Sequence, residues 1–180
     1  MPPVTIETPR LRLRPPRAAD ARDVFDRYAS DPRVTRYLGW PTHRTIADSE
    51  QFLAFCAAEW DRWPAGPFII ESRAGGTILG GTGLGFETPQ QAATGYVLAY
   101  DAWGMGYATE ALTAMRDLAA GLRLERLYAL CHPTHRPSAR VLEKCGFLCE
   151  GTLRAYTEFP NLAPGVAADV LCYAVRRPQA

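Results

Sequence analysis

The residues whose types and spacing could do chemistry are concentrated in one stretch near the middle of the chain, residues 95–111. There the segment Trp103-Gly104-Met105-Gly106-Tyr107-Ala108 joins an apolar run to an amphipathic one. This join predicts a strand, a glycine loop and a helix, and the first turn of a helix carries unpaired N–H donors and the positive end of a dipole. Glycines let the backbone come close to an anion. Residues 103–109 therefore predict a phosphate-binding loop; the alternative is a plain connection whose glycines serve only turn geometry.

Two familiar phosphate-binding patterns fit this loop poorly. A dinucleotide fold needs Gly-x-Gly-x-x-Gly, but the third position is Thr109, and Glu125 precedes the next strand instead of ending it, so no carboxylate is placed for a ribose. A nucleotide P-loop needs Gly-Lys-Ser/Thr, which does not follow. The competing phosphate-binding interpretation is a loop that binds the pyrophosphate of an acyl-CoA.

Several separated motifs resemble the GNAT superfamily of N-acetyltransferases, in particular its RimJ/RimL-like branch. The loop is similar to the family pattern Gln/Arg-x-x-Gly-x-Gly/Ala, with Trp103 at the first position, as is typical of the branch. The other matching segments, in chain order, are residues 8–14, 31–34, 106–111, 138–147 and 150–154. Because these motifs span almost the whole chain in the right order, the resemblance is more specific than the loop alone.

The resemblance implies that acetyl-CoA is the cosubstrate and lies against the strand before the loop. In GNAT enzymes that strand splays from its neighbour, and its backbone bonds the pantetheine; an N–H near Leu98 would also polarise the thioester carbonyl. The implied cofactor-binding residues are Val97, Leu98, Ala99, Trp103, Gly104, Met105, Gly106, Tyr107, Ala108, Thr109, His135, Ser138 and Lys144.

The same resemblance implies direct attack of an amine on the thioester, which needs a base for the amine and a proton donor for the departing thiolate. Ser138 is the expected donor; the alternative is that it caps the helix that begins near it. Glu158 is the expected base, with Glu87 as the other carboxylate, and either could instead be a solvated surface residue. His135 stands where the family usually has Asn. It could keep that contact, take part in proton transfer, or face solvent.

Aromatic residues are expected around the acceptor, namely Tyr37, Trp40 and Tyr156. Trp60 and Trp63 are further candidates, although the helical spacing of Trp60 favours the core. Lys144 and Arg140 could contact phosphates of CoA, and Arg140 in particular could instead lie on a solvated helix face.

Two other function classes stay open beside the transferase. One is a module that senses acyl-CoA without turnover, for which the substitution at His135 is the hint. The other is a dinucleotide enzyme, which NAD binding would reveal. For the transferase, the acceptor is a protein N-terminus or a small-molecule amine. A homodimer is expected only because it is common among relatives.

Composition sets limits on partners and location. The chain has 180 residues, the length of one compact domain, and a formal net charge of +1, so no strong field draws it to nucleic acid or membrane. Its five cysteines include no Cys-x-x-Cys, and its three histidines have no metal-ligand spacing, so no metal is expected and the thiols are expected to be buried. No stretch has signal-peptide or membrane-span character, which favours the cytoplasm.

The elements that must position the loop follow from periodicity and turn signals. We expect an α/β fold in one domain over residues 1–180, with a mixed, mostly antiparallel sheet of about seven strands and helices on both faces. The expected strands are 11–14, 67–72, 77–86, 93–100, 126–131, 147–156 and 168–175. The expected helices are 20–30, 46–63, 106–121 and 136–145. The apolar residues expected to face inward are Phe52, Phe55, Cys56 and Trp60 in helix 46–63, and Ala111, Leu112, Met115, Leu118 and Ala119 in helix 106–121. The glycine run 80–85 predicts a bulge or a close backbone approach.

Overall fold

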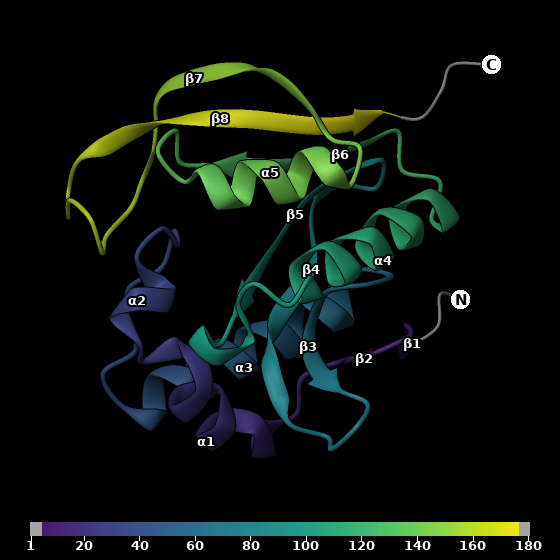
Figure 1. Cartoon of the computed structure of the whole chain (residues 1–180), viewed down its shortest axis with the longest axis vertical. Helices are drawn as coiled ribbons and strands as arrows, with labels where there is room; N and C mark the ends of the chain where they lie inside the picture. The colour runs from purple at the N-terminus through teal and green to yellow at the C-terminus, as the bar shows by residue number, and fades with distance from the viewer. Residues whose placement is uncertain (1–4, 177–180) are drawn as a thin grey trace.

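The sheet is mixed and has eight strands among residues 5–176, the part of the chain that the computed structural model describes (Figure 1). Its order is β1-β2-β3-β4-β5-β6-β8-β7, and only the β5–β6 pair is parallel. The strands are β1 (Ile6–Glu7), β2 (Leu11–Arg14), β3 (Pro67–Ser72), β4 (Ile78–Thr88), β5 (Gln91–Leu98), β6 (Arg126–Cys131), β7 (Leu148–Glu158) and β8 (Ala167–Arg176). The expected mostly antiparallel sheet is confirmed, with β1 as an additional edge strand.

Helices cover both faces of this sheet. The α-helices are α1 (Ala21–Val24), α2 (Pro32–Thr35), α3 (Ile46–Arg62), α4 (Tyr107–Gly121) and α5 (Arg136–Lys144). Helices α1 and α3 pack together beside β3 and β4, whereas α4 packs on β2, β4 and β5 and contacts α5. Figure 1 shows α4 and α3 on opposite sides of the strands. The first expected helix is broken into a 3-10 turn, α1 and a π-helical turn (Phe25–Ala29), and α2 lies in a stretch expected to be irregular.

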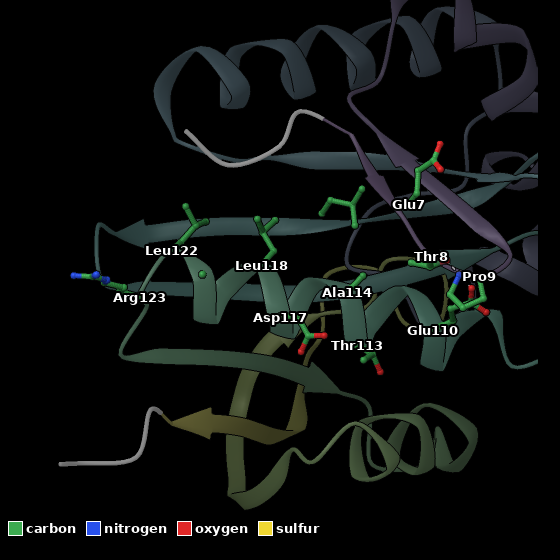
Figure 2. A pocket seen from close by; sticks show the side chains of 12 residues that line it. Glu7, Thr8, Pro9, Glu110, Thr113, Ala114, Asp117, Leu118, Leu122 and Arg123 are labelled. Atoms are coloured by element: carbon green, nitrogen blue, oxygen red, sulfur yellow. Dashed lines mark hydrogen bonds between the residues drawn. The ribbon is translucent and has the colours of Figure 1, made fainter.

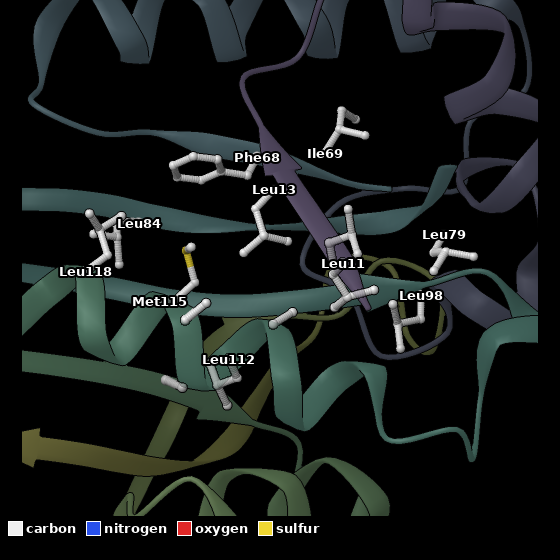
Figure 3. Close-up of a cluster of buried hydrophobic side chains, with 14 of the residues drawn as sticks. Leu11, Leu13, Phe68, Ile69, Leu79, Leu84, Leu98, Leu112, Met115 and Leu118 are labelled. Atoms are coloured by element: carbon white, nitrogen blue, oxygen red, sulfur yellow. The ribbon is translucent and has the colours of Figure 1, made fainter. Parts of the chain in front are cut away.

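The core lies between α4 and the sheet and continues under α3. Leu11, Leu112 and Met115 are among its fully buried members, and Figure 3 shows them packed with Leu13, Phe68 and Leu98. Every apolar residue expected on the inner face of α4 is buried, namely Ala111, Leu112, Met115, Leu118 and Ala119. The pattern of α4 therefore fixes which side of the helix faces the sheet and where its first turn emerges.

Two expectations about burial are wrong. Phe55 was expected on the inner face of its helix but is 57% exposed, because the face that α3 buries runs through Ser49, Leu53 and Cys56. The thiols were expected to be buried, yet Cys149 is exposed because β7 lies at the edge of the sheet; the other four are buried and all five are free.

The glycine run is closely approached by neighbouring backbone, as expected, and a bulge lies just before it, at Leu79. The register of β3 and β4 shifts between Ile70 and Glu71. Gly80 has φ +156°, and a Cβ there would stand 2.0 Å from the carbonyl oxygen of Val97. This contact brings β4 tightly against the part of β5 that leads into the glycine loop.

Candidate active site

Strands β5 and β6 separate along their length. They pair only at Gln91–Arg126, Ala92–Leu127 and Ala93–Tyr128, so residues 94–98 and 129–131 have no ladder partner across from one another. We call these two stretches the splayed edges. The N–H of Ala99 donates to Leu79 O at 2.8 Å. Because an antiparallel ladder alternates, the N–H of Leu98 then points away from β4, toward the β6 side.

The three residues expected to bond pantetheine are therefore not equivalent. Val97 is paired with Gly81 of β4, and both backbone groups of Ala99 are used, the carbonyl by Ala102 N at 2.9 Å. The carbonyl of Leu98 accepts a hydrogen bond from the Trp103 indole at 2.9 Å. The N–H of Leu98 is left as the donor facing the β6 side.

The loop after β5 presents a run of unpaired backbone donors. Gly104 and Gly106 have φ of +75° and +80°, and Gly106 is the N-cap of α4 without a side-chain cap. Within residues 5–176, no acceptor contacts the N–H groups of the loop and first helical turn, which belong to Gly104, Met105, Gly106, Tyr107, Ala108 and Thr109. Together with the helix dipole, these donors suit a phosphate or pyrophosphate.

Ser138 lies on α5 and faces the splayed edges. The N-cap of α5 is His135, so Ser138 is the third helical residue and not the cap. Its hydroxyl interacts with the partly buried Tyr96 and the buried Cys131. Burial raises the pKa of the Tyr96 phenol on β5, and the hydrogen bond with Ser138 opposes that rise. Burial likewise raises the pKa of the Cys131 thiol at the end of β6, and Ser138 again opposes it. Ser138 therefore connects the two edges.

His135 is partly buried. Its ring stacks on Tyr37, with centroids 4.4 Å apart and planes 15° apart. Burial lowers the pKa of His135, and the neighbouring His132 lowers it further. His132 in turn lies edge-on against Phe159, with centroids 4.9 Å apart. These rings form an aromatic rim, defined here as Tyr37, His132, His135 and Phe159, beside the end of β6.

The two carboxylates expected as bases have their hydrogen-bond partners outside the aromatic rim. Glu158 is exposed at the end of β7, and its Oε1 accepts a hydrogen bond from Gly165 N at 2.8 Å, within the loop that leads to β8. Glu87, near the end of β4, accepts a hydrogen bond from the Tyr128 hydroxyl. No hydrogen bond or ion pair within residues 5–176 joins either carboxylate to Ser138 or to the aromatic rim.

Of the three aromatic residues expected at the acceptor, only Tyr37 belongs to the rim. Trp40 packs beside His43 and Phe52 against α3, and Tyr156 is 53% exposed on β7. Trp60 packs edge-on against Phe68, as its spacing favoured.

The basic residues expected near CoA both lie on α5 and are exposed: Lys144 and Arg140. Lys144 precedes Cys145, whose thiol donates to Thr109 O at 3.5 Å. This contact places the end of α5 beside the first turn of α4.

Two residues of this region escaped the sequence interpretation. Tyr96 looked like one more apolar strand residue, and nothing local marks its contact with Ser138. Arg10 belongs to a matching motif, but its contacts lie about a hundred positions away along the chain: its Nη1 donates to Met105 O at 2.8 Å. The only sequence signal for this contact is that the chain contains both a basic residue in the matching motif 8–14 and a glycine loop.

No cluster of three or more His, Cys, Asp or Glu side chains in residues 5–176 is arranged to hold a metal ion. Within the same range, every helix is too short or too polar to cross a membrane.

Comparisons with known proteins bear on the whole chain. The family model described as Acetyltransferase (GNAT) domain matches residues 10–148. The chain is 29% identical to the uncharacterized N-acetyltransferase p20 of Bacillus licheniformis, in an alignment of 174 residues that covers 95% of each protein.

Solved structures of acetyltransferases are also similar to this chain. RimJ of Mycobacterium smegmatis in complex with CoA-disulfide is 26% identical, with a TM-score of 0.77 and coverage of 92% of this chain and 81% of that one. The microcin C7 self-immunity acetyltransferase MccE, in complex with acetyl-CoA and AMP, has a TM-score of 0.84 over 97% of both chains. At 20% identity, that second likeness concerns the fold alone.

Proposed function

Because the chain belongs to the GNAT acetyltransferase family, we propose that it is an acetyl-CoA-dependent N-acetyltransferase that moves an acetyl group to a primary amine by direct attack. One observation carries the proposal: the Leu98 N–H at the splayed edges and the unpaired N–H groups of residues 104–109 belong to one continuous segment, with only residues 99–103 between them. We further propose that the chain forms one domain and works in the cytoplasm, where its five free cysteines would stay reduced.

The backbone of this region fits acetyl-CoA. The six donors at the loop and the first turn of α4 match the pyrophosphate, since the phosphate oxygens accept hydrogen bonds and the helix dipole favours the negative charge. The unpaired edge of β5 can accept an extended pantetheine arm as an added strand. Leu98 N–H would then donate to the thioester carbonyl, whose oxygen gains charge as the amine attacks.

The reaction needs protons moved at two places. The amine nitrogen forms a bond to the acetyl carbon, the carbon–sulfur bond breaks, and the thiolate takes a proton while the attacking nitrogen loses one. Ser138 is the proposed donor to the thiolate, because its hydroxyl lies at the splayed edges and is backed by the Tyr96 phenol, which can replace the proton.

The proton on the amine requires a base, and two groups are proposed. His135 has a lowered pKa and so stays neutral and able to accept a proton, and it belongs to the aromatic rim. Glu158 is exposed and its Oε1 accepts a hydrogen bond from Gly165 N; no residue among 5–176 hydrogen-bonds its Oε2, which would accept the proton through water. The rim position favours His135 over Glu158.

The acceptor is proposed as a protein N-terminus or a small-molecule amine. The test is release of CoA thiol from acetyl-CoA across a panel of peptides, polyamines, amino acids and aminoglycosides. The wild type is compared with Ser138→Ala, His135→Gln and Glu158→Gln. Acceptor-dependent release that falls roughly a hundredfold in Ser138→Ala, with the affinity for CoA unchanged, supports the proposal.

Three results would overturn the proposal in part or in whole. CoA binding without turnover for every acceptor would favour a sensor module over a transferase. Loss of the base should lower kcat at neutral pH. If His135→Gln or Glu158→Gln keeps full activity, the residue replaced in that variant is not the base. Absence of CoA binding by the wild type would remove the proposal altogether.

A further inference from the structure

The N-terminal segment contacts the cofactor loop through one side chain. Arg10 comes directly before β2, and its Nη1 donates to Met105 O at 2.8 Å. Its Nε donates to Glu110 Oε2 at 2.7 Å, and its guanidinium lies 4.6 Å from the centre of the Tyr107 ring. A single arginine thus touches the loop, the first helical residue and the first turn of α4.

Glu110 is the second half of this contact. Its Oε1 accepts hydrogen bonds from Thr8 Oγ1 at 2.6 Å and from Arg10 N at 2.8 Å. Figure 2 shows Thr8 and Glu110 meeting where the segment before β2 crosses the start of α4. We call Thr8, Arg10 and Glu110 the N-terminal latch. A groove of about 940 Å³ continues from it along α4, lined further on by Leu118 and Leu122.

The latch fixes the direction of a loop peptide. In a trans peptide the C=O and the following N–H point in opposite directions. Because Arg10 holds the carbonyl of Met105, the N–H of Gly106 is turned away from Arg10, among the other unpaired donors of the loop. Arg10 Nη2 lies 3.4 Å from where a Cβ of residue 106 would stand, so the glycine also leaves room for the guanidinium.

The latch also balances charge. Burial alone would raise the pKa of Glu110, but hydrogen bonds from Thr8 and Arg10 outweigh it and hold the pKa below its usual value. Glu110 is therefore an anion, and its side chain is only 14% exposed, so solvent screens it little. Without a paired cation, this carboxylate would repel any phosphate bound at the same helical turn.

We infer that Arg10 is a positioning residue for acetyl-CoA: it orients the Gly106 N–H through the Met105 carbonyl and neutralises Glu110, without itself reacting. The inference rests on the proposed function, because it concerns the pyrophosphate of that cosubstrate. It also gives the segment before β2 a role at a loop about 95 residues further along the chain.

The first test compares Arg10→Ala with Arg12→Ala. Arg12 is a matched control, since its side chain is 50% exposed against 47% for Arg10 and pairs with Glu7 away from the loop. The dissociation constant for CoA, measured by calorimetry, is expected to rise roughly tenfold in Arg10→Ala, because the variant loses one charge-assisted hydrogen bond and with it the orientation of the loop peptide. It should stay within about twofold in Arg12→Ala.

The second test uses S-acetylpantetheine, which lacks the pyrophosphate. Arg10→Ala should lower kcat/KM for acetyl-CoA roughly tenfold and leave kcat/KM for S-acetylpantetheine unchanged. A general structural defect would lower both values, and that result would overturn the inference. The double variant Arg10→Ala/Glu110→Gln should recover part of the CoA affinity. Full recovery would mean that Arg10 acts only by neutralising the charge of Glu110, and it would overturn the orienting role.

The two proposals fail separately. If the wild type does not bind CoA, the proposed function fails and the role of Arg10 falls with it. If the wild type binds CoA and Arg10→Ala binds it equally well, only the role of Arg10 is wrong.

Discussion

At the scale of single residues, burial changes the acid–base behaviour of two histidines. Burial lowers the pKa of His135 beneath Tyr37 and of His43, whose Nδ1 lies 2.8 Å from Ser49 Oγ. A nearby Asp48 partly opposes the shift at His43. Each imidazole therefore takes up a proton less readily in the folded protein than in the unfolded chain.

This difference predicts a loss of stability in mild acid. Just below the ordinary histidine pKa of 6.5, the unfolded chain binds more protons than the folded protein, so the free energy of unfolding falls as the pH falls. We expect urea denaturation of the wild type to show this fall between about pH 7 and pH 5, and of His43→Gln/His135→Gln to show less of it. The lowered carboxylate pKa values, such as that of Asp48, act at lower pH, so this window isolates the histidines. Equal slopes for both proteins would contradict the assignment.

Sequence reasoning reached only some of the residues at this scale. The loop of residues 103–109 could be predicted because strand, glycines and helix are contiguous in the chain. The contacts of Arg10 with Met105 and of Tyr96 with Ser138 could not, because they depend on how distant segments pack. Glu158 was chosen by likeness of position, and the hydrogen bond that holds it to Gly165 has no sequence signal.

At the scale of elements, periodicity succeeded where one face is uniformly apolar. The inner face of α4 was predicted residue by residue, because its apolar positions follow one stripe. In α3, aromatic residues occur on two sides, and choosing Phe55 shifted the predicted stripe. Strand β1 has only two residues, too few to show alternation. The splay of β5 from β6 follows from pairing that stops after Ala93, which the strand patterns do not encode.

The glycines of β4 allow a prediction about this element. In Gly80→Ala the new Cβ would meet Val97 O at 2.0 Å, at a φ of +156° that other residues rarely adopt. We expect the free energy of unfolding to fall by about 3 kcal/mol or more, as for other strained and overpacked sites. Gly85→Ala is the control, because its Cβ would stand 4.0 Å from the nearest atom, Ala93 O, and it should change stability by less than about 1 kcal/mol.

Chemical denaturation of both variants measures the difference. Since Gly80 holds β4 against the end of β5, any folded Gly80→Ala protein should also bind CoA more weakly. A Gly80→Ala protein as stable as Gly85→Ala would mean that the β4 bulge relaxes without cost.

At the scale of the whole molecule, one side-chain amide links the loop between β7 and β8 to the end of α2 and the segment after it. Asn161, in the loop between β7 and β8, donates from Nδ2 to Thr35 O and Trp40 O, each at 2.8 Å. Its Oδ1 accepts from Thr42 N at 2.9 Å and from Thr42 Oγ1 at 3.1 Å. The side chain thus ties the loop that carries Phe159 to the segment that carries Tyr37. This link holds together the two segments that supply Phe159 and Tyr37 to the aromatic rim, and no local sequence pattern predicts it.

The last prediction concerns this tie. Asn161→Ala removes four hydrogen bonds and leaves the Trp40 carbonyl without its donor and the Thr42 N–H without its acceptor, so the free energy of unfolding should fall by about 2–4 kcal/mol. Gln90→Ala, at an exposed side chain, is the control and should cost less than about 0.5 kcal/mol. Because Asn161 holds the rim and not the glycine loop, KM for the amine acceptor should rise while the affinity for CoA stays the same. Equal losses of both affinities would mean that the rim and the cofactor loop move as one unit, and that the division of the site between them is wrong.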